Sequence, residues 1–151
     1  DIEQVVTSYT KAVMINSPNN PSGIMYSEEF IAEIVQFCEK KGLYLIMDDI
    51  YHRLIFDGKQ PINCYKYAKK SIENSKIIVV NGVSKQYAMT GFRIGWAVAN
   101  KKLIEVMANI QGHQTSGPSA LLQHAAVAMP RGIGPHARSP ERHLHADDRG
   151  G

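Results

Sequence analysis

Three short apolar runs recur along the first half of the chain, at residues 11–16, 43–48 and 76–81. Their sequences are KAVMIN, LYLIMD and KIIVVN, and each is apolar almost without interruption. Continuous apolarity of this length is typical of parallel strands covered on both faces, whereas a half-exposed strand alternates apolar and polar residues. We therefore expect three parallel strands.

The segment between the first two runs has the pattern of an amphipathic helix. Ser27 is a suitable N-cap, and Glu28 and Glu29 suit the positive end of the helix dipole. Gly42 is a suitable C-terminal stop. One face of this helix carries the apolar side chains of Phe30, Ile31, Ile34, Val35 and Cys38.

The second half of the chain is less regular at first and then turns helical. Residues 49–75 predict a long connection with a short helix around CYKYAKK at 64–70. Residues 93–99, RIGWAVA, predict a fourth strand whose direction the pattern does not fix. A second helix from Ser116 to about Met129, with Pro118 in its first turn, follows a helical stripe. That stripe consists of Leu103, Val106, Met107 and Ile110. The fold class is therefore α/β, a mostly parallel sheet with flanking helices.

Composition narrows the class of protein. A chain of 151 residues with 44% hydrophobic and 21% charged residues is typical of one globular domain. A net charge of +3 with dispersed lysines argues against a nucleic-acid surface. No apolar run approaches the ~20 residues of a membrane span. Two cysteines provide neither a disulfide framework nor metal spacing, so we expect a cytoplasmic protein.

The end of the chain differs in composition from the rest. All 11 lysines lie within the first 102 residues, whereas four of the six arginines lie in the last 22. Residues 130–151 have almost no aliphatic side chains and no helical or strand period. We expect residues 1–129 to be the folded part and residues 130–151 to be a disordered or out-of-frame tail. The chain also starts without an initiator methionine, which is expected of an internal piece of a longer protein.

Polar residues follow the first two predicted strands. Residues 16–23, NSPNNPSG, suit a connecting loop, and the prolines beside Asn20 would also hold its amide rigidly for a ligand. Asp48 and Asp49 end the second strand, where a turn or cap is the ordinary function of aspartate. With His52 they would also suggest a metal site, although no further ligand cluster stands near. A turn would bring the phenol of Tyr51 back towards Asp48.

A lysine and an arginine follow the third predicted strand. Most lysines lie on the surface, but the apolar neighbours of Lys85 suggest a desolvated pocket, which would make its amine the nucleophile that a Schiff base needs. Arg93, between Gly91 and Gly95, suits a bidentate phosphate or carboxylate contact. Because ligands of open α/β sheets bind beyond the carboxyl ends of the strands, these residues should converge. A carbonyl, a ring nitrogen, a phenolic oxygen and a phosphate, the groups they would bind, all occur in pyridoxal phosphate.

Three segments, NSPNNPSG, DDIYHRLIF and SKQYAMTGFRIGWA, resemble in this order the class I/II aminotransferases. These are pyridoxal-phosphate enzymes of fold type I, and the chain is most similar to their bacterial aspartate-aminotransferase type. The likeness extends over roughly residues 5–128. It implies part of the large domain of a transaminase of amino acid metabolism, which moves an amino group between an amino acid and a 2-oxo acid. It also implies a homodimeric full-length parent.

The resemblance assigns roles residue by residue. It implies that Lys85 forms the Schiff base and then moves the proton of the substrate, and that Asp48 pairs with the pyridine nitrogen. It implies that Tyr51 and Asn20 bind the 3-oxygen of the ring, and that Arg93 binds the phosphate.

The chain departs from the family pattern in two respects. Many relatives carry a phosphate-binding serine three residues before the lysine, where this chain has Gly82, so Ser84 is the substitute candidate. The family chain is also more than twice as long, and its substrate-binding arginine and dimer-spanning tyrosine have no match here. We expect a central fragment of the large domain with little transaminase activity alone.

Other functions remain open at this point. The motifs equally suit a non-catalytic fragment that binds the cofactor, an aminotransferase-like regulator module, or another reaction on the same scaffold, such as β-elimination or cyclopropane-carboxylate synthesis. A metal-binding function of the tail histidines has weak support. Those histidines are His136, His143 and His145.

Overall fold

The computed structural model of the chain describes residues 2–132. The last helix extends through Gly132, three residues past the boundary expected at residue 129. The rest of the predicted tail, residues 133–151, lies outside the described residues.

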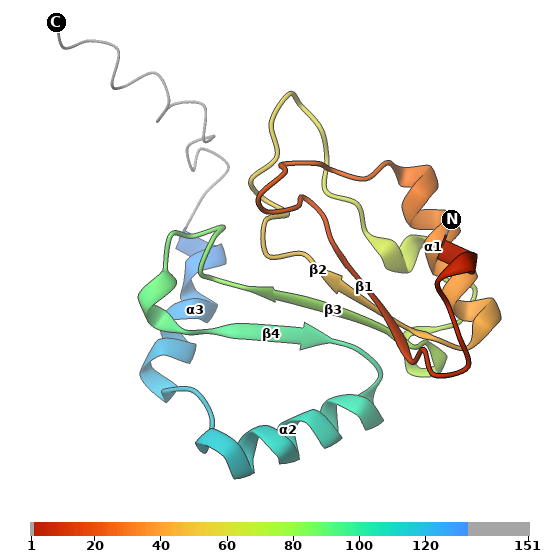
Figure 1. Ribbon diagram of the computed structural model, residues 1–151. Coiled ribbons are helices and arrows are strands. Elements are labelled where there is room, and N and C mark those ends of the chain that lie inside the picture. Colours follow the sequence, from red (N-terminus) through yellow and green to blue (C-terminus); the bar gives the residue numbers. More distant parts are fainter. Residues whose placement is uncertain (1, 133–151) are drawn as a thin grey trace, which may run out of the picture.

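A four-stranded sheet forms the centre of the fold (Figure 1). Its spatial order is the chain order, with the first three strands parallel and the fourth antiparallel to the third. The predicted parallel strands are confirmed, and the direction of the fourth, which the sequence left open, is antiparallel. The strands are β1 (Ala12–Asn16), β2 (Tyr44–Asp48), β3 (Ile77–Gly82) and β4 (Gly95–Val98).

Helix α1 (Glu28–Lys41) has the predicted caps. The Ser27 hydroxyl accepts from the Phe30 amide at 3.2 Å, and Gly42 ends the helix in the left-handed region at a φ of 68°. Four of the five residues on the predicted face are buried, but Phe30 is 39% exposed. It lies about 100° around the helix from Ile31 and stacks on Tyr26 instead, with the ring centroids 4.5 Å apart.

The hydrophobic core lies between α1 and one face of the sheet. Leu45 and Met47 of β2 are almost wholly buried there beside Ile31. The other face is open, because Met14 is 66% and Val80 is 36% exposed. The expectation that these strands are covered on both faces is therefore wrong for residues 2–132. The strands carry apolar side chains on both faces, but the described helices do not cover all of them.

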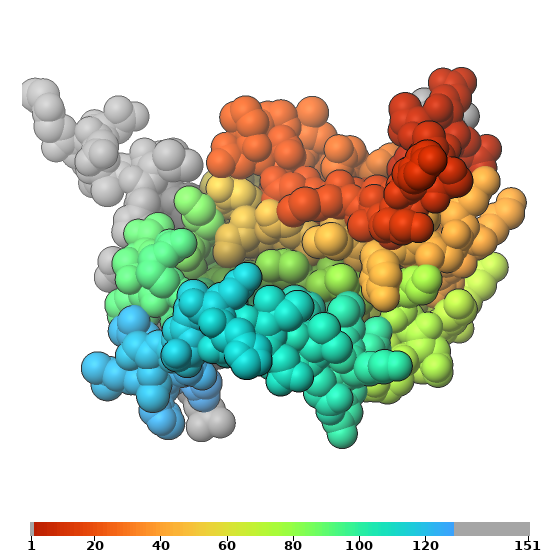
Figure 2. Space-filling model, turned by 60° about the horizontal axis from the view of Figure 1, so that its bottom comes forward, coloured from red at the N-terminus to blue at the C-terminus, as the bar shows by residue number. Residues whose placement is uncertain are grey.

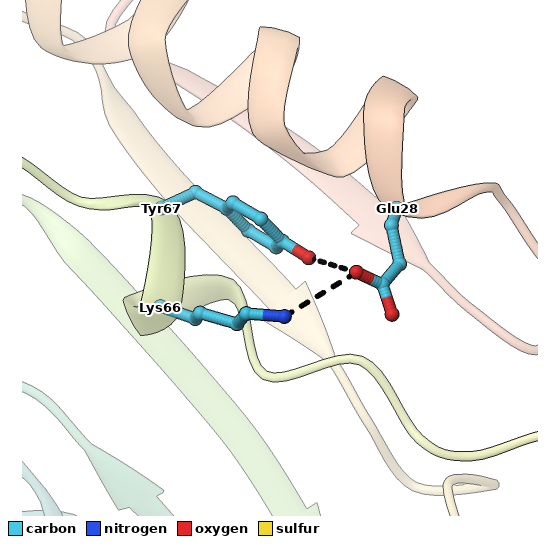
Figure 3. Close-up of polar contacts among 3 residues, drawn as sticks. All are labelled: Glu28, Lys66 and Tyr67. Atoms are coloured by element: carbon cyan, nitrogen blue, oxygen red, sulfur yellow. Dashed lines mark hydrogen bonds and ion pairs between the residues drawn. The ribbon is translucent and has the colours of Figure 1, made fainter.

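The connection between β2 and β3 is held against α1 by a polar cluster. This connection contains the 3-10 helices η2 (Cys64–Tyr67), where a short helix was predicted, and η3 (Ile72–Asn74). The Tyr67 hydroxyl donates to Glu28 Oε2 at 2.5 Å, and Lys66 Nζ lies 3.4 Å from the same oxygen (Figure 3). The Tyr67 hydrogen bond, followed by the charge of Lys66, lowers the pKa of Glu28. Because these groups are exposed, the cluster orients the connection more than it stabilises the fold.

Helices α2 (Lys101–Thr115) and α3 (Ala120–Gly132) follow β4. Asn100 caps α2 by accepting from the Leu103 amide at 2.9 Å. Ser116, predicted to begin the second helix, is instead the C-cap of α2 at a φ of 57°, and α3 begins at Ala120. Figure 2 shows these two helices on the side of the molecule next to the segment after β3.

The stripe predicted on α2 is largely uncovered, since Val106 is 49% and Ile110 is 53% exposed. The remaining short elements are η1 (Ile2–Gln4) and η4 (Thr90–Phe92). Within residues 2–132 no helix is both long and apolar enough to span a membrane.

Candidate active site

The loops after β1 and β2 are joined at the carboxyl edge of the sheet. Asn16 ends β1 directly opposite Asp48, which ends β2. The Asn16 amide donates to the Asp48 carbonyl at 3.0 Å, and its oxygen accepts from the Asn20 backbone amide at 3.1 Å. Asn16 therefore positions the loop that carries Asn20 against the strand that carries Asp48.

Three of the predicted site residues meet at this edge. Asn20 Nδ2 donates to the Tyr51 hydroxyl at 3.0 Å, across 31 positions of sequence. The ammonium of Lys85 lies over the Tyr51 ring, 5.8 Å from its centroid. That distance is within the range of a cation–π contact, so Tyr51 has a partner on its hydroxyl and a cation on its ring face.

The surroundings of Lys85 differ from the sequence prediction. Its side chain is exposed rather than enclosed in an apolar pocket. Val83 turns into the core with 1% exposure, and Ala88 lies in an exposed turn at a φ of 54°. The apolar neighbours of Lys85 therefore do not desolvate its amine in the described part of the chain.

Asp48 lies at the same edge and is half-buried. Its Oδ1 accepts from the Ile50 amide at 3.1 Å, so it also serves the ordinary turn function. Among residues 2–132 no other hydrogen bond reaches this carboxylate, which leaves Oδ2 available to a ligand.

Arg93 is placed at the same edge by the pairing of β3 with β4. The Val83 amide donates to the Ile94 carbonyl at 3.1 Å, which brings Ser84 and Arg93 to adjacent chain segments. Arg93 precedes β4 rather than lying in it, with left-handed backbone at a φ of 55°. Its Nη1 donates to the Thr90 carbonyl at 2.9 Å, and its side chain lines a hollow of about 620 Å³ between β4 and α2. In the described range no hydrogen bond or ion pair joins it to the other predicted site residues.

The packing around Gly82 leaves no room for a side chain. A Cβ built there would lie 2.9 Å from the Ile94 carbonyl oxygen and 3.2 Å from Ile50 Cδ1. Gly95, likewise, would bring a Cβ within 3.0 Å of the Asn81 carbonyl oxygen, whereas a Cβ at Gly91 would meet open space. Of the two glycines beside Arg93, only Gly95 is therefore required by the packing of the described chain.

Asp49 is a site neighbour whose environment the sequence did not reveal. It lines a small cavity with apolar side chains, among them Ile31, Met47 and Ile62. Burial, and then the charge of Asp48, raises the pKa of Asp49 to about 6. The signal in the sequence is only its position one residue after a buried strand, which is equally compatible with an exposed turn.

Replacing Asp49 by asparagine should stabilise the chain at neutral pH. The unfolded carboxyl ionises near its ordinary pKa of 3.8, whereas the folded one keeps its proton up to about pH 6. Folding stability therefore falls as pH rises through this window, and the Asp49→Asn variant should escape that loss. We expect a gain of about 1–2 kcal/mol above the window after allowance for solvent screening, measured by urea unfolding from about pH 4 to pH 7. Asp57→Asn, in an exposed turn, is the matched control; equal profiles for the wild type and Asp49→Asn would contradict the assignment.

The metal-site alternative gains no geometric support from the described chain. No group of three His, Cys, Asp or Glu side chains within residues 2–132 is arranged to hold a metal ion. The tail histidines His136, His143 and His145 lie outside the described residues.

A mixed sheet with polar side chains gathered beyond its carboxyl ends is the architecture of an α/β enzyme domain. Comparison with known families identifies it further: the chain belongs to the aminotransferase class I and II family, whose model matches residues 1–137.

Curated relatives agree with this family. Aspartate aminotransferase of Bacillus subtilis is 35% identical over 131 residues, which is 87% of this chain and 33% of the relative. A probable aspartate/prephenate aminotransferase of Rickettsia bellii is 40% identical over 134 residues, again 87% of this chain and 33% of the relative. The chain thus spans about a third of the length of the curated relatives that it matches.

Solved structures confirm the fold. Aspartate aminotransferase of Thermotoga maritima superposes with a TM-score of 0.78 at 32% identity, covering 86% of this chain and 34% of that one. Aspartate aminotransferase of Thermus thermophilus with maleate superposes with a TM-score of 0.77 at 32% identity, covering 87% and 33%. The fold is therefore that of part of a fold-type I aminotransferase.

Proposed function

We propose that this chain carries the cofactor-binding centre of a pyridoxal-phosphate-dependent transaminase, which moves an amino group between an amino acid and a 2-oxo acid. The observation that carries the proposal is the hydrogen bond of Asn20 to Tyr51 with the Lys85 ammonium over the same ring. The Asn20 amide, the Tyr51 hydroxyl and the Lys85 amine come together from three separate loops. In this proposal the ring oxygen of the cofactor would bind to the first two groups, and its carbonyl would bind to the amine.

The residues present fit pyridoxal phosphate. When Asn20 donates to the Tyr51 oxygen, the Tyr51 O–H remains free to donate to the ring oxygen of the cofactor. The available Oδ2 of Asp48 would accept from the protonated ring nitrogen. Arg93, with Ser84 nearby, would hold the phosphate with the N–H groups of its guanidinium that do not bind the Thr90 carbonyl. The bound cofactor would supply an electron sink for the carbanion formed at the substrate.

Lys85 has two tasks in this proposal. Its primary amine would hold the carbonyl of the cofactor, and as a free amine it would move a proton at the substrate α-carbon. The exposed side chain over Tyr51 has the freedom of movement that the second task needs.

Family membership supports a proposal for the substrates and the assembly. The similarity to aspartate aminotransferases and to a probable aspartate/prephenate aminotransferase favours aspartate as an amino donor. The resemblance also supports a homodimeric parent.

We expect the isolated 151-residue chain to bind the cofactor but to transfer amino groups poorly, because it spans about a third of the relatives' length. The purified chain is mixed with pyridoxal phosphate, its visible absorbance is recorded, and amino transfer from aspartate to 2-oxoglutarate is then assayed. Absence of a protein-dependent visible band would refute cofactor binding by this chain. Robust turnover would refute the expectation that it lacks an essential part of the site.

A further inference from the structure

One buried amide joins the two loops that carry Tyr51 and Lys85. Asn81, in β3, is 8% exposed and lies on the sheet face that packs against α1. Its Nδ2 is 2.6 Å from His52 Nδ1, and its Oδ1 is 3.3 Å from Gln86 Nε2. His52 directly follows Tyr51, and Gln86 directly follows Lys85. The chain neighbours of two candidate cofactor contacts therefore meet at the side chain of Asn81.

The orientation of the Asn81 amide is determined by the backbone. The Gly82 amide donates to Asn81 Oδ1 at 2.7 Å, so the oxygen faces Gly82 and the NH₂ group faces His52. Gln86 is held on the same side, because its Nε2 also donates to the Gly82 carbonyl at 2.7 Å. These contacts leave Asn81 one orientation in which its hydrogen bonds are satisfied.

The Asn81 contact assigns one form of His52. Asn81 Nδ2 is a donor and needs His52 Nδ1 as an acceptor, which places the imidazole proton on Nε2, whereas the Asp49 carbonyl, 3.0 Å from the same nitrogen, would need Nδ1 as a donor. The contact with Asn81 is the shorter at 2.6 Å, and the Asp49 carbonyl already accepts from the His52 backbone amide at 2.9 Å, so we assign Nδ1 as the acceptor. Protonation of His52 would replace its acceptor with a second donor and break the bond to Asn81.

We propose that Asn81 is a positioning residue that holds the Tyr51 and Lys85 loops at a fixed separation, with His52 in its neutral Nε2–H form. This inference rests on the proposed function, because the separation matters for a cofactor that touches both loops. The bridge itself exists without cofactor and can be tested without it. Removing it should loosen both loops together.

The first experiment uses the cofactor-free chain. Amide hydrogen exchange is measured for residues 50–53 and 83–88 in the wild type, His52→Ala, Asn81→Ala and the double variant. Each single change should speed exchange in both segments about tenfold, the size expected for one buried hydrogen bond. The double variant should exchange no faster than Asn81→Ala, because both changes break the same link. Asn74→Ala and His113→Ala, at exposed positions, are the matched controls. Faster exchange in one segment only, or additive effects, would overturn the proposal.

A second variant, Asn81→Asp, keeps the size of the side chain and tests the link in cofactor binding. Its carboxylate accepts but does not donate, so it bonds to His52 only when Nδ1 is protonated. Cofactor affinity relative to wild type should therefore be about tenfold weaker when His52 is neutral and should recover on acidification. Asp49 and Tyr65 line the same hollow as His52, and the new carboxyl would change their protonation. The ratio is therefore measured in the Asp49→Asn background and below the pH at which tyrosine ionises. A ratio that does not change with pH would count against the bridge.

These readouts separate the two proposals. If the wild-type chain fails to bind pyridoxal phosphate, the proposed function fails for this chain, and the exchange experiment still decides whether Asn81 links the loops. In the free protein, the nitrogen chemical shifts of the neutral form of His52 should show Nδ1 without a proton. A proton on Nδ1 would contradict the assigned hydrogen bond.

Discussion

Replacing Lys85 by alanine should abolish covalent attachment of pyridoxal phosphate at this position. Borohydride treatment of the wild-type chain with cofactor should leave a stable adduct on the peptide that contains Lys85. The alanine variant should give no such adduct and no protein-dependent visible band. The reason is chemical: attachment needs a primary amine beside the carbonyl of the cofactor, and we propose that Lys85, which lies over the Tyr51 ring, supplies it. Mass spectrometry of the digested protein measures the result.

Two further variants make this test specific. Lys85→Arg keeps a positive charge for the Tyr51 ring but has no primary amine, so it should fail as the alanine variant does. Lys59→Ala removes an exposed lysine from a turn and should leave the adduct at Lys85 intact. An undiminished visible band in Lys85→Ala would show that another amine holds the cofactor.

Replacing Leu45 by alanine should leave much of the chain unfolded. Leu45 is fully buried between the sheet and α1, and removal of a large core side chain typically costs about 2–5 kcal/mol. A domain of this size has about 5–15 kcal/mol in total. This chain should lie towards the low end of that range, because one face of its sheet is open. Urea unfolding followed by circular dichroism measures the loss.

Met14→Ala is the matched control for Leu45→Ala. Met14 lies on the neighbouring strand but is 66% exposed on the opposite face, so we expect a loss below about 1 kcal/mol. Similar losses in the two variants would mean that the open face is covered in solution.

The local parts of the fold could be predicted from the sequence, because their causes are local. The cap at Ser27 and the stop at Gly42 are set by the residues themselves. Ser116 shows the limit of that reasoning, since serine serves as an N-cap but here takes left-handed backbone before Gly117, at a φ of 89°. The apolar run of β4 predicts a strand but not its direction, because the pattern is the same for a parallel and an antiparallel strand. The direction is decided by the pairing of β4 with β3.

Some residues of the candidate site could likewise be predicted from the sequence, and others could not. Asn20, Tyr51 and Lys85 were predictable because the family motifs contain them. Asp49 and Asn81 were not, because their surroundings come from segments distant in sequence. One signal for Asn81 was present: it has the same strand parity as Ile77 and Val79, which places an amide on the side where apolar residues face α1.

The sheet order has a consequence for the order in which the site is assembled. Within residues 2–132 each strand pairs with its neighbour in sequence, so none of these four strands has to insert between two that are already paired. During synthesis, β1, α1 and β2 can dock once residues through about 51 have left the ribosome. The segments that position Asn20 and Tyr51 are then present, so these two side chains can form their hydrogen bond before Lys85 has been translated. The pair proposed to bind the ring oxygen can thus form before the lysine proposed to anchor the cofactor has been made.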